Sequence, residues 1–101
     1  MELIAYQAYR NPELEISYWR TSTGYEVDFI LNDMELAIEV KGSRRVHSGH
    51  IRGLKALLEE HQVKKAIVIS LDTSPRKIDS SIKVHPWQYF LEVLWNGSLG
   101  V

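Results

Sequence analysis

The segment Lys65–Leu71, KAIVISL, is the part of the chain that most restricts the possible folds. Its apolar side chains follow one another almost without a break, so a strand formed here would be apolar on both faces. A strand of that kind lies inside a sheet whose two faces are both covered, usually by helices. The run is also far shorter than the roughly 20 residues that a membrane-spanning helix needs. We therefore predict that residues 65–71 form an interior strand of an α/β domain.

The rest of the chain predicts helices and further strands around that strand. Asn11-Pro12 ends a first helix, and Ser48 is a suitable N-cap for a second one. Pro86 suits the first position of a final helix, which ends at Asn96-Gly97. In chain order we expect a helix over 1–10, strands over 16–21, 25–31 and 35–41, a helix after residue 48, strands over 65–71 and 81–85, the last a short edge strand, and a helix over 86–95. A three-strand meander, a crossover helix and further strands make an α/β fold with a mixed β-sheet flanked by helices.

Length and composition indicate a single domain over residues 1–101. Apolar residues make up 45% of the 101 positions, which is enough for one core. The chain has no cysteine, which excludes disulfides, cysteine-bound zinc and a thiol nucleophile and favours a cytoplasmic location. No signal peptide or membrane segment is visible. The chain begins inside a helical pattern without an N-cap, so we expect Met1 to open a C-terminal fragment of a longer chain.

The formal net charge of −1 conceals an acidic half joined to a basic half. Residues 1–40 carry eight acids and two bases, whereas residues 41–101 carry five acids and ten bases. The densest basic stretch is KGSRRVHSGHIRGLK, residues 41–55, with five Lys or Arg, two histidines and no acid. Such a stretch is either a solvated surface or a rim that contacts phosphate groups. Which of these applies depends on whether the acids of the first half converge.

Strands 25–31 and 35–41 are expected to form a hairpin with its turn at Asn32-Asp33. A two-residue turn there pairs Val27 with Ile38. This register makes one face of the hairpin wholly apolar, which is what fixes the register of a half-buried hairpin.

The opposite face of this hairpin collects acidic side chains. In the expected register Glu26 lies directly across from Glu39, and Asp28 lies on the diagonal. Opposed like charges destabilise a sheet, so three acids this close require a proton or cations. Lys41, two residues after Glu39, supplies one positive charge, and a divalent ion such as Mg²⁺, which prefers oxygen ligands, would supply the rest. The alternative is a solvent-facing strand whose acids have no common role.

Asp28, ten intervening positions and then Glu39-Val40-Lys41 form a pattern that resembles the D…ExK signature of the PD-(D/E)XK nucleases. The order of a helix, a three-strand meander, a helix and a further strand also resembles the core of that fold. A wider set of residues is Tyr18-Trp19-Arg20-Thr21, Gly24, Glu26-Val27-Asp28-Phe29, Ile38-Glu39-Val40-Lys41, Pro86-Trp87 and Phe90-Leu91. This set is similar to the uncharacterised C-terminal domain of many bacterial and archaeal AAA-type ATPases, which is related to the PD-(D/E)XK fold. The resemblance runs from about residue 2 to residue 99.

The resemblance implies a restriction-endonuclease-like fold and a phosphodiester hydrolase that acts on nucleic acid with Mg²⁺ or Mn²⁺. Asp28 and Glu39 would bind the metal, and Glu2 or Glu26 would supply a further acid. Lys41 would orient the attacking water or help to deprotonate it. The resemblance also implies an ATPase domain upstream in the same chain.

Four bases follow the expected site and are the candidates for contact with nucleic acid. A phosphate backbone entering the site would meet them as contacts that do not depend on base sequence. These bases are Arg44, Arg45, Arg52 and Lys55. Their alternative role is that of ordinary exposed charges.

Two other classes of function remain open. The domain could keep the nuclease fold and serve the ATPase as a non-catalytic sensor, dimerisation or interaction module, with the apolar stripe of the last helix docked on another domain. A small stand-alone resolvase is a third class, which the slightly acidic balance disfavours. The sequence is compatible with a homo-oligomer and does not separate these functions.

Overall fold

The computed structural model describes residues 2–79 and 81–100, apart from the side chain of Glu2. Its helices are α1 (Glu2–Tyr9), α2 (Arg52–Glu60) and α3 (Trp87–Trp95), and a 3₁₀ turn, η1 (Ser48–Ile51), precedes α2. Its strands are β1 (Ile16–Arg20), β2 (Glu26–Leu31), β3 (Leu36–Val40), β4 (Lys65–Ser70), β5 (Arg76–Lys77) and β6 (Ile82–Pro86). Every helix and strand expected from the sequence is present, and η1 and β5 are additional.

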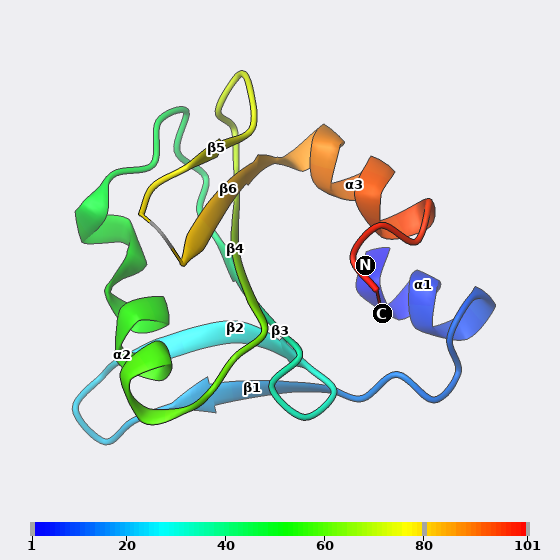
Figure 1. Cartoon of the computed structure of the whole chain (residues 1–101), viewed down its shortest axis with the longest axis horizontal. Helices are drawn as coiled ribbons and strands as arrows, with labels where there is room; N and C mark the ends of the chain where they lie inside the picture. The colour runs from blue at the N-terminus through cyan, green and yellow to red at the C-terminus, as the bar shows by residue number, and fades with distance from the viewer. Residues whose placement is uncertain (1, 80, 101) are drawn as a thin grey trace.

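The strands form one mixed sheet in the order β1-β2-β3-β4-β6-β5. The first three strands are an antiparallel meander, β3, β4 and β6 are parallel neighbours, and β5 is antiparallel to β6. Strand β4 therefore lies between two parallel partners, as its apolar sequence predicts (Figure 1). The prediction that residues 81–85 form an edge strand is wrong, because the two-residue strand β5 covers the outer side of β6.

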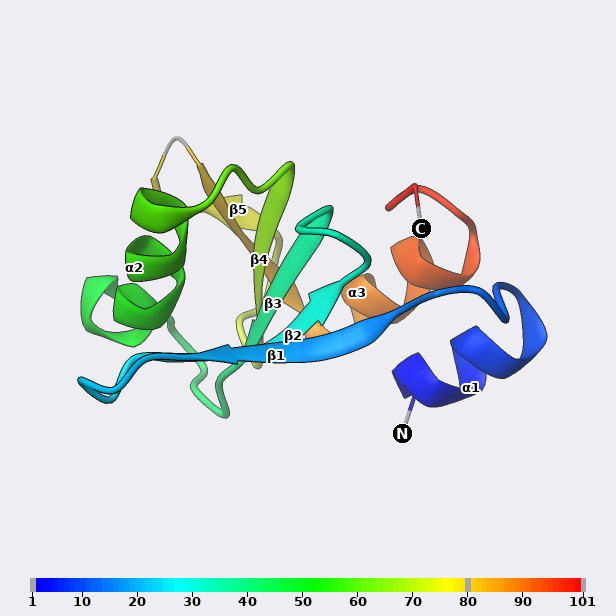
Figure 2. The same ribbon diagram turned by 90° about the horizontal axis from the view of Figure 1, so that it is seen from below.

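Helices cover both faces of the sheet (Figures 1 and 2). Helices α1 and α3 lie on one face and pack on a core that includes Leu31, Leu36 and Ile38. Helix α2 lies on the other face and packs on a core that includes Ile30 and Ala37. The hairpin of β2 and β3 is therefore buried on both sides, and the expected division into one apolar and one polar face is wrong. None of the helices in the described residues is long and apolar enough to cross a membrane.

Helix α2 approaches β2 so closely that only glycine fits at position 53. A Cβ atom added to Gly53 would lie 2.2 Å from the backbone carbonyl oxygen of Glu26. We expect Gly53→Ala to push α2 away from the sheet and to lower the free energy of unfolding by roughly 2 kcal/mol or more. Urea unfolding of the two proteins measures this loss.

Gly42→Ala is the matched control, since no atom lies within 4 Å of a Cβ added there. We expect that variant to unfold within about 0.5 kcal/mol of the parent protein. Equal losses in the two variants would contradict the close approach of α2 to β2.

Candidate functional site

The register between β2 and β3 differs from the expected one by two residues. The observed Cα partners are Phe29 with Ile38, Ile30 with Ala37 and Leu31 with Leu36. The connection is a four-residue turn over 32–35 rather than a two-residue turn. Its geometry depends on Asn32, which has a φ of 55° and whose side-chain Oδ1 accepts a hydrogen bond of 3.1 Å from the backbone of Glu15.

The new register brings Asp28 to Glu39. Continuing the β2–β3 pairs by one position places these two residues opposite each other, and their side chains share a hydrogen bond. The carboxylate of Asp28 also accepts a hydrogen bond of 2.9 Å from the backbone N–H of Val40. In return, the backbone N–H of Asp28 donates to the carboxyl group of Glu39. The two acids of the D…ExK pattern are therefore held in direct contact at the end of the ladder.

A β-bulge in β2 sets the direction of Asp28. Ser17 pairs with Ile30 and Trp19 pairs with Val27, so β2 contains one residue more than β1 between these pairs. The bulge turns Val27 to the same side as Ile30, against α2. Such bulges re-aim side chains beside functional sites. Asp28 lies within this bulge and is only half-buried.

Glu39 is the buried member of the pair, with 5% of its surface exposed. Burial, together with the hydrogen bond and negative charge of Asp28, raises the pKa of Glu39 to about 8, against the opposing charge of Lys41. At neutral pH without metal, Glu39 is therefore mostly protonated. Neighbouring acids avoid repulsion either by binding a proton or by binding a cation, and here a proton serves.

The raised pKa predicts how stability depends on pH when no metal is present. Unfolded Glu39 loses its proton near pH 4.5, whereas folded Glu39 keeps it up to about pH 8. The unfolded state thus binds fewer protons in this window, so stability falls as the pH rises from about 4.5 to 8. The total change is of the order of a few kcal/mol. Glu39→Gln, which cannot ionise, should flatten this slope in urea unfolding at pH 5 and pH 8.

Glu26→Gln is the control for this measurement and should keep the slope of the parent protein. A slope that is the same in the parent and in Glu39→Gln would show that Glu39 does not carry this pH dependence.

The other two candidate acids do not join the pair in the described residues. The prediction that Glu26 faces Glu39 is wrong, because the register is shifted by two positions. Glu26 is exposed, and its Oε2 lies 3.6 Å from Nε of Arg20 on β1. The side chain of Glu2, on α1, lies outside the described residues. Within residues 2–79 and 81–100, no group of three or more His, Cys, Asp or Glu side chains could hold a metal ion.

Lys41 lies at the end of β3, beside the pair. Its backbone N–H donates a hydrogen bond of 2.9 Å to the carbonyl of Ile69 on β4, which fixes the chain at this point. Its side chain is half-buried, and its charge acts on the carboxyl group of Glu39. The structure therefore brings together Asp28, Glu39 and Lys41.

The four candidate bases for phosphate contact are all exposed. Arg44 and Arg45 lie in the loop that follows β3, and Arg52 and Lys55 lie on α2. Lys55 has an acidic neighbour, since its Nζ lies 3.9 Å from Oδ2 of Asp79.

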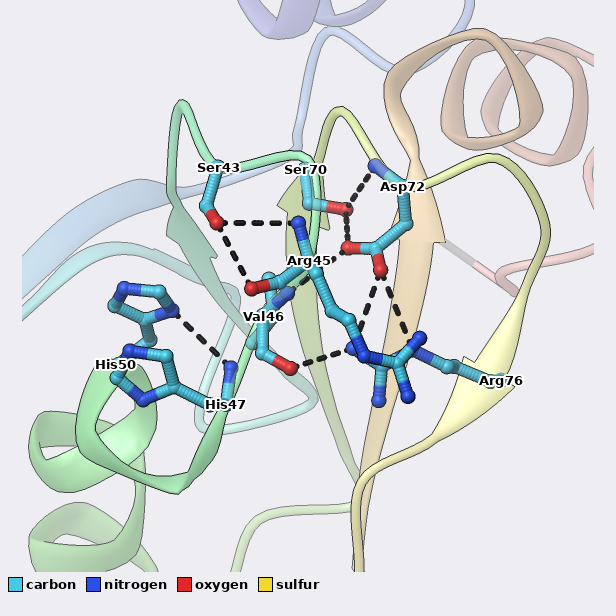
Figure 3. A network of polar contacts seen from close by, with 8 residues as sticks. All are labelled: Ser43, Arg45, Val46, His47, His50, Ser70, Asp72 and Arg76. Atoms are coloured by element: carbon cyan, nitrogen blue, oxygen red, sulfur yellow. Dashed lines mark hydrogen bonds and ion pairs between the residues drawn. The ribbon is translucent and has the colours of Figure 1, made fainter.

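A buried polar network holds the loop that carries Arg44 and Arg45 (Figure 3). Asp72, only 7% exposed, accepts hydrogen bonds from Ser70 Oγ, from the Val46 N–H at 3.3 Å and from the guanidinium of Arg76 at 3.1 Å. Arg76 in turn donates to the Val46 carbonyl. Burial by itself raises the pKa of Asp72, but these hydrogen bonds outweigh it and lower the pKa. The loop is thereby tied to the end of β4.

Sequence reasoning did not identify this network. Ser70 ends the buried strand β4 and Asp72 follows it with one residue between them, and short polar side chains in such positions often bond to nearby backbone. That local pattern was the signal in the sequence that could have indicated the network around Asp72. The partner Arg76 lies on β5, which the sequence did not predict.

His47 and His50 stack on each other just before α2, with ring centroids 3.7 Å apart. The Nδ1 of His47 accepts from the Gly49 N–H at 3.1 Å, and the Nδ1 of His50 accepts from the His47 N–H at 3.2 Å. His47, not Ser48, is therefore the N-cap of this turn. These bonds give both histidines a structural role, as caps.

An apolar groove of about 810 Å³ opens beside Asp28. It is formed by α1, the start of α3 and the ends of the central strands. Trp87 at its edge is 47% exposed. The lining residues are Leu3, Ala5, Asp28, Phe29, Val40, Ile69, Trp87 and Phe90.

A family model matches residues 1–90 of the chain, and its description is "Domain of unknown function (DUF4143)". The matched region contains the acid pair, Lys41 and the network around Asp72. A search of curated proteins and a search of solved structures found no match.

Proposed function

The chain belongs to the DUF4143 family, and we propose that it is a phosphodiester hydrolase domain that acts on nucleic acid with Mg²⁺ or Mn²⁺. The observation that carries this proposal is the contact between Asp28 and Glu39, with Lys41 two residues farther along β3. The side chains of this trio are the types that metal-dependent phosphodiester hydrolysis requires.

The donor set of the pair fits a divalent ion. Carboxylate oxygens are the side-chain ligands that Mg²⁺ prefers, and Mg²⁺ usually binds through one or two of them while keeping several waters. Asp28 and Glu39 supply two such groups, and the half-exposed Val40 has its carbonyl between Glu39 and Lys41. Glu2 on α1 remains a candidate for a further acid. A bound ion supplies positive charge at the scissile phosphate and lowers the pKa of its water.

The protein's own residues then have distinct tasks. Asp28 and Glu39 hold the ion, for which Glu39 must give up its proton. Lys41 places a positive charge beside the carboxylates, where it orients the attacking water and the phosphate. The exposed bases Arg44, Arg45 and Arg52, together with Lys55, contact backbone phosphates without reading base sequence.

The proposal includes the restriction-endonuclease-like fold and an attached ATPase. The order of α1, the β1–β3 meander, α2 and β4 supports that fold. The DUF4143 family is often found with AAA-type ATPases. A G-x-x-x-x-G-K-[ST] motif upstream in the full-length gene product would support the linkage, and its absence would argue against it.

Cleavage of labelled DNA and RNA, single- and double-stranded, tests the activity. We expect cleavage with Mg²⁺ or Mn²⁺ and none with EDTA. Lys41→Ala should reduce the cleavage rate by about 100-fold or more, since it removes a charge aimed at the reacting groups. The same variant should keep the metal-induced rise in melting temperature, because Asp28 and Glu39 remain.

An interaction module is the second candidate function, and the groove beside Asp28 favours it. This groove is mostly apolar, and Trp87 at its edge is half-exposed, as at many protein interfaces. On this view the acids and the fold are kept without catalysis. If the protein binds metal but cleaves none of the four substrates, and Lys41→Ala changes neither property, the interaction module is favoured over the hydrolase.

A further inference from the structure

A second pocket, of about 900 Å³, is lined by other residues of α3 than those that line the groove at Asp28. Its charged lining is entirely basic within the described residues, although the chain contains 13 acids. These bases are Lys64, Lys65, Arg76, Lys77 and Lys83. They are the five bases of residues 41–101 other than Lys41 and the four candidate bases for phosphate contact. None of the residues that line this pocket belongs to the Asp28–Glu39–Lys41 trio.

Three of these lysines lie on one face of the sheet, on three adjacent strands. Lys77 on β5 and Lys83 on β6 are direct Cα partners, and both are exposed. Lys83 is also paired with Ile67 on β4, so Lys65, two residues before Ile67, points to the same face. Like charges placed directly opposite each other destabilise a sheet unless an anion neutralises them. Among residues 2–79 and 81–100, no carboxylate forms an ion pair with Lys77 or Lys83.

His85 adds an uncharged polar group to the same pocket. It lies two residues after Lys83 on β6 and is only 7% exposed, and its Nδ1 has no hydrogen-bond partner in the part of the chain that the structure describes. A buried polar atom without a partner is costly, and in native proteins it usually has a ligand or a role. The ring of Tyr89 contacts His85 edge-on at 4.9 Å and provides a partly exposed aromatic surface beside the lysines.

We propose that this pocket binds a phosphorylated ligand of nucleotide size. Lysine ammonium groups are strong donors to phosphate oxygens, and a volume of about 900 Å³ lies within the range of small-molecule sites. Lys77 and Lys83 contact the phosphates, Nδ1 of His85 contributes a hydrogen bond, and Tyr89 offers a stacking surface for a base. The phosphates belong either to a free nucleotide or to a nucleic-acid strand. The site uses no metal and no residue of the proposed hydrolase centre.

Calorimetric titration of the chain in EDTA at low salt, with pyrophosphate, AMP, ATP and single-stranded oligothymidylate as probes, tests the proposal. We expect pyrophosphate or ATP to bind, and Lys83→Glu to weaken this binding about tenfold or more. Lys83→Glu should itself be stable, because it places opposite charges across from each other on β5 and β6. Lys77→Glu, on the edge strand, makes the same change from the other side and is the second variant.

Arg10→Glu is the matched control, since it changes the net charge equally and Arg10 is exposed and outside the pocket. With the titrations repeated at about 0.15 M salt, where exposed charges more than about 8 Å apart are largely screened, it should change the affinity by less than about threefold. Asp28→Asn should leave binding to the basic pocket unchanged. The hydrolase proposal can therefore fail without affecting the pocket proposal. Binding of the oligonucleotide alone, lost in Lys83→Glu, would identify a nucleic-acid strand as the source of the phosphates. No binding by any probe, or equal weakening by Lys83→Glu and Arg10→Glu, would overturn the proposal.

Discussion

Asp28→Asn is expected to abolish the stabilisation of the protein by Mn²⁺. A ligand present at about 100 times its dissociation constant stabilises the folded state by about 2.7 kcal/mol. In a domain of this size, each kcal/mol shifts the melting temperature by about 4–8 °C, so the parent protein should gain about 10 °C or more. Asp28 is one of two carboxylates that the structure brings together, and without it the site loses half of these ligands. Thermal melts with and without Mn²⁺ measure the difference.

Glu26→Gln makes a sharp control for this result. The variant loses one negative charge on the same strand, but Glu26 is exposed beside Arg20 and away from Glu39. We expect it to retain the full rise with Mn²⁺. If Glu26→Gln loses the rise in melting temperature as fully as Asp28→Asn does, the register that places Glu26 opposite Glu39 was correct. The metal site is then not the Asp28–Glu39 pair. If the parent protein gains no stability from Mn²⁺ or Mg²⁺, the metal part of the proposal fails.

Asp72→Ala is expected to lower the free energy of unfolding by about 3 kcal/mol, the largest loss among the proposed substitutions. The substitution removes the acceptor of three donors at once, and it leaves the guanidinium of Arg76 and the N–H of Val46 without their partner. Asp72→Asn keeps the shape and one acceptor oxygen, so its loss should be smaller. Urea unfolding measures both losses.

The exposed pair of Arg20 and Glu26 provides the comparison for this prediction. Exposed ion pairs contribute little, so Arg20→Ala should change the free energy of unfolding by no more than about 0.5 kcal/mol. A loss below about 1 kcal/mol in Asp72→Ala would show that the network does not hold the loop.

The sequence allowed the order of the elements to be predicted because their patterns are local. The apolar run over 65–71 predicts an interior strand, and β4 is one. The final helix was expected from its apolar stripe, although it begins at Trp87, with Pro86 as the residue before it. Strand β5 could not be predicted, since Arg76 and Lys77 are polar and pair with β6 only through tertiary structure.

Only part of the candidate site, and not its geometry, could be predicted: Glu26 does not join the pair, and the side chain of Glu2 lies outside the described residues. The D…ExK pattern correctly pointed to Asp28 and Glu39 as neighbours. Their relation depends on two backbone features that side-chain periodicity does not encode, the four-residue turn over 32–35 and the bulge in β2. A register shift of two residues leaves each side chain on the same face of the hairpin. The pattern of apolar residues alone therefore could not detect it. The basic pocket was missed because Lys65, Lys77 and Lys83 come from three strands that meet only in the folded sheet.

The meander also sets the order in which the proposed hydrolase centre forms during folding. Asp28 and Glu39 are separated by only eleven positions and meet through a hairpin, so a short loop closure brings them together. Hairpins form in microseconds, whereas parallel pairing of β3 with β4 must wait for a crossover of more than twenty residues. The acid pair can therefore meet before β4, β6 and the basic pocket exist, and completion of the domain then buries Glu39 around an existing contact.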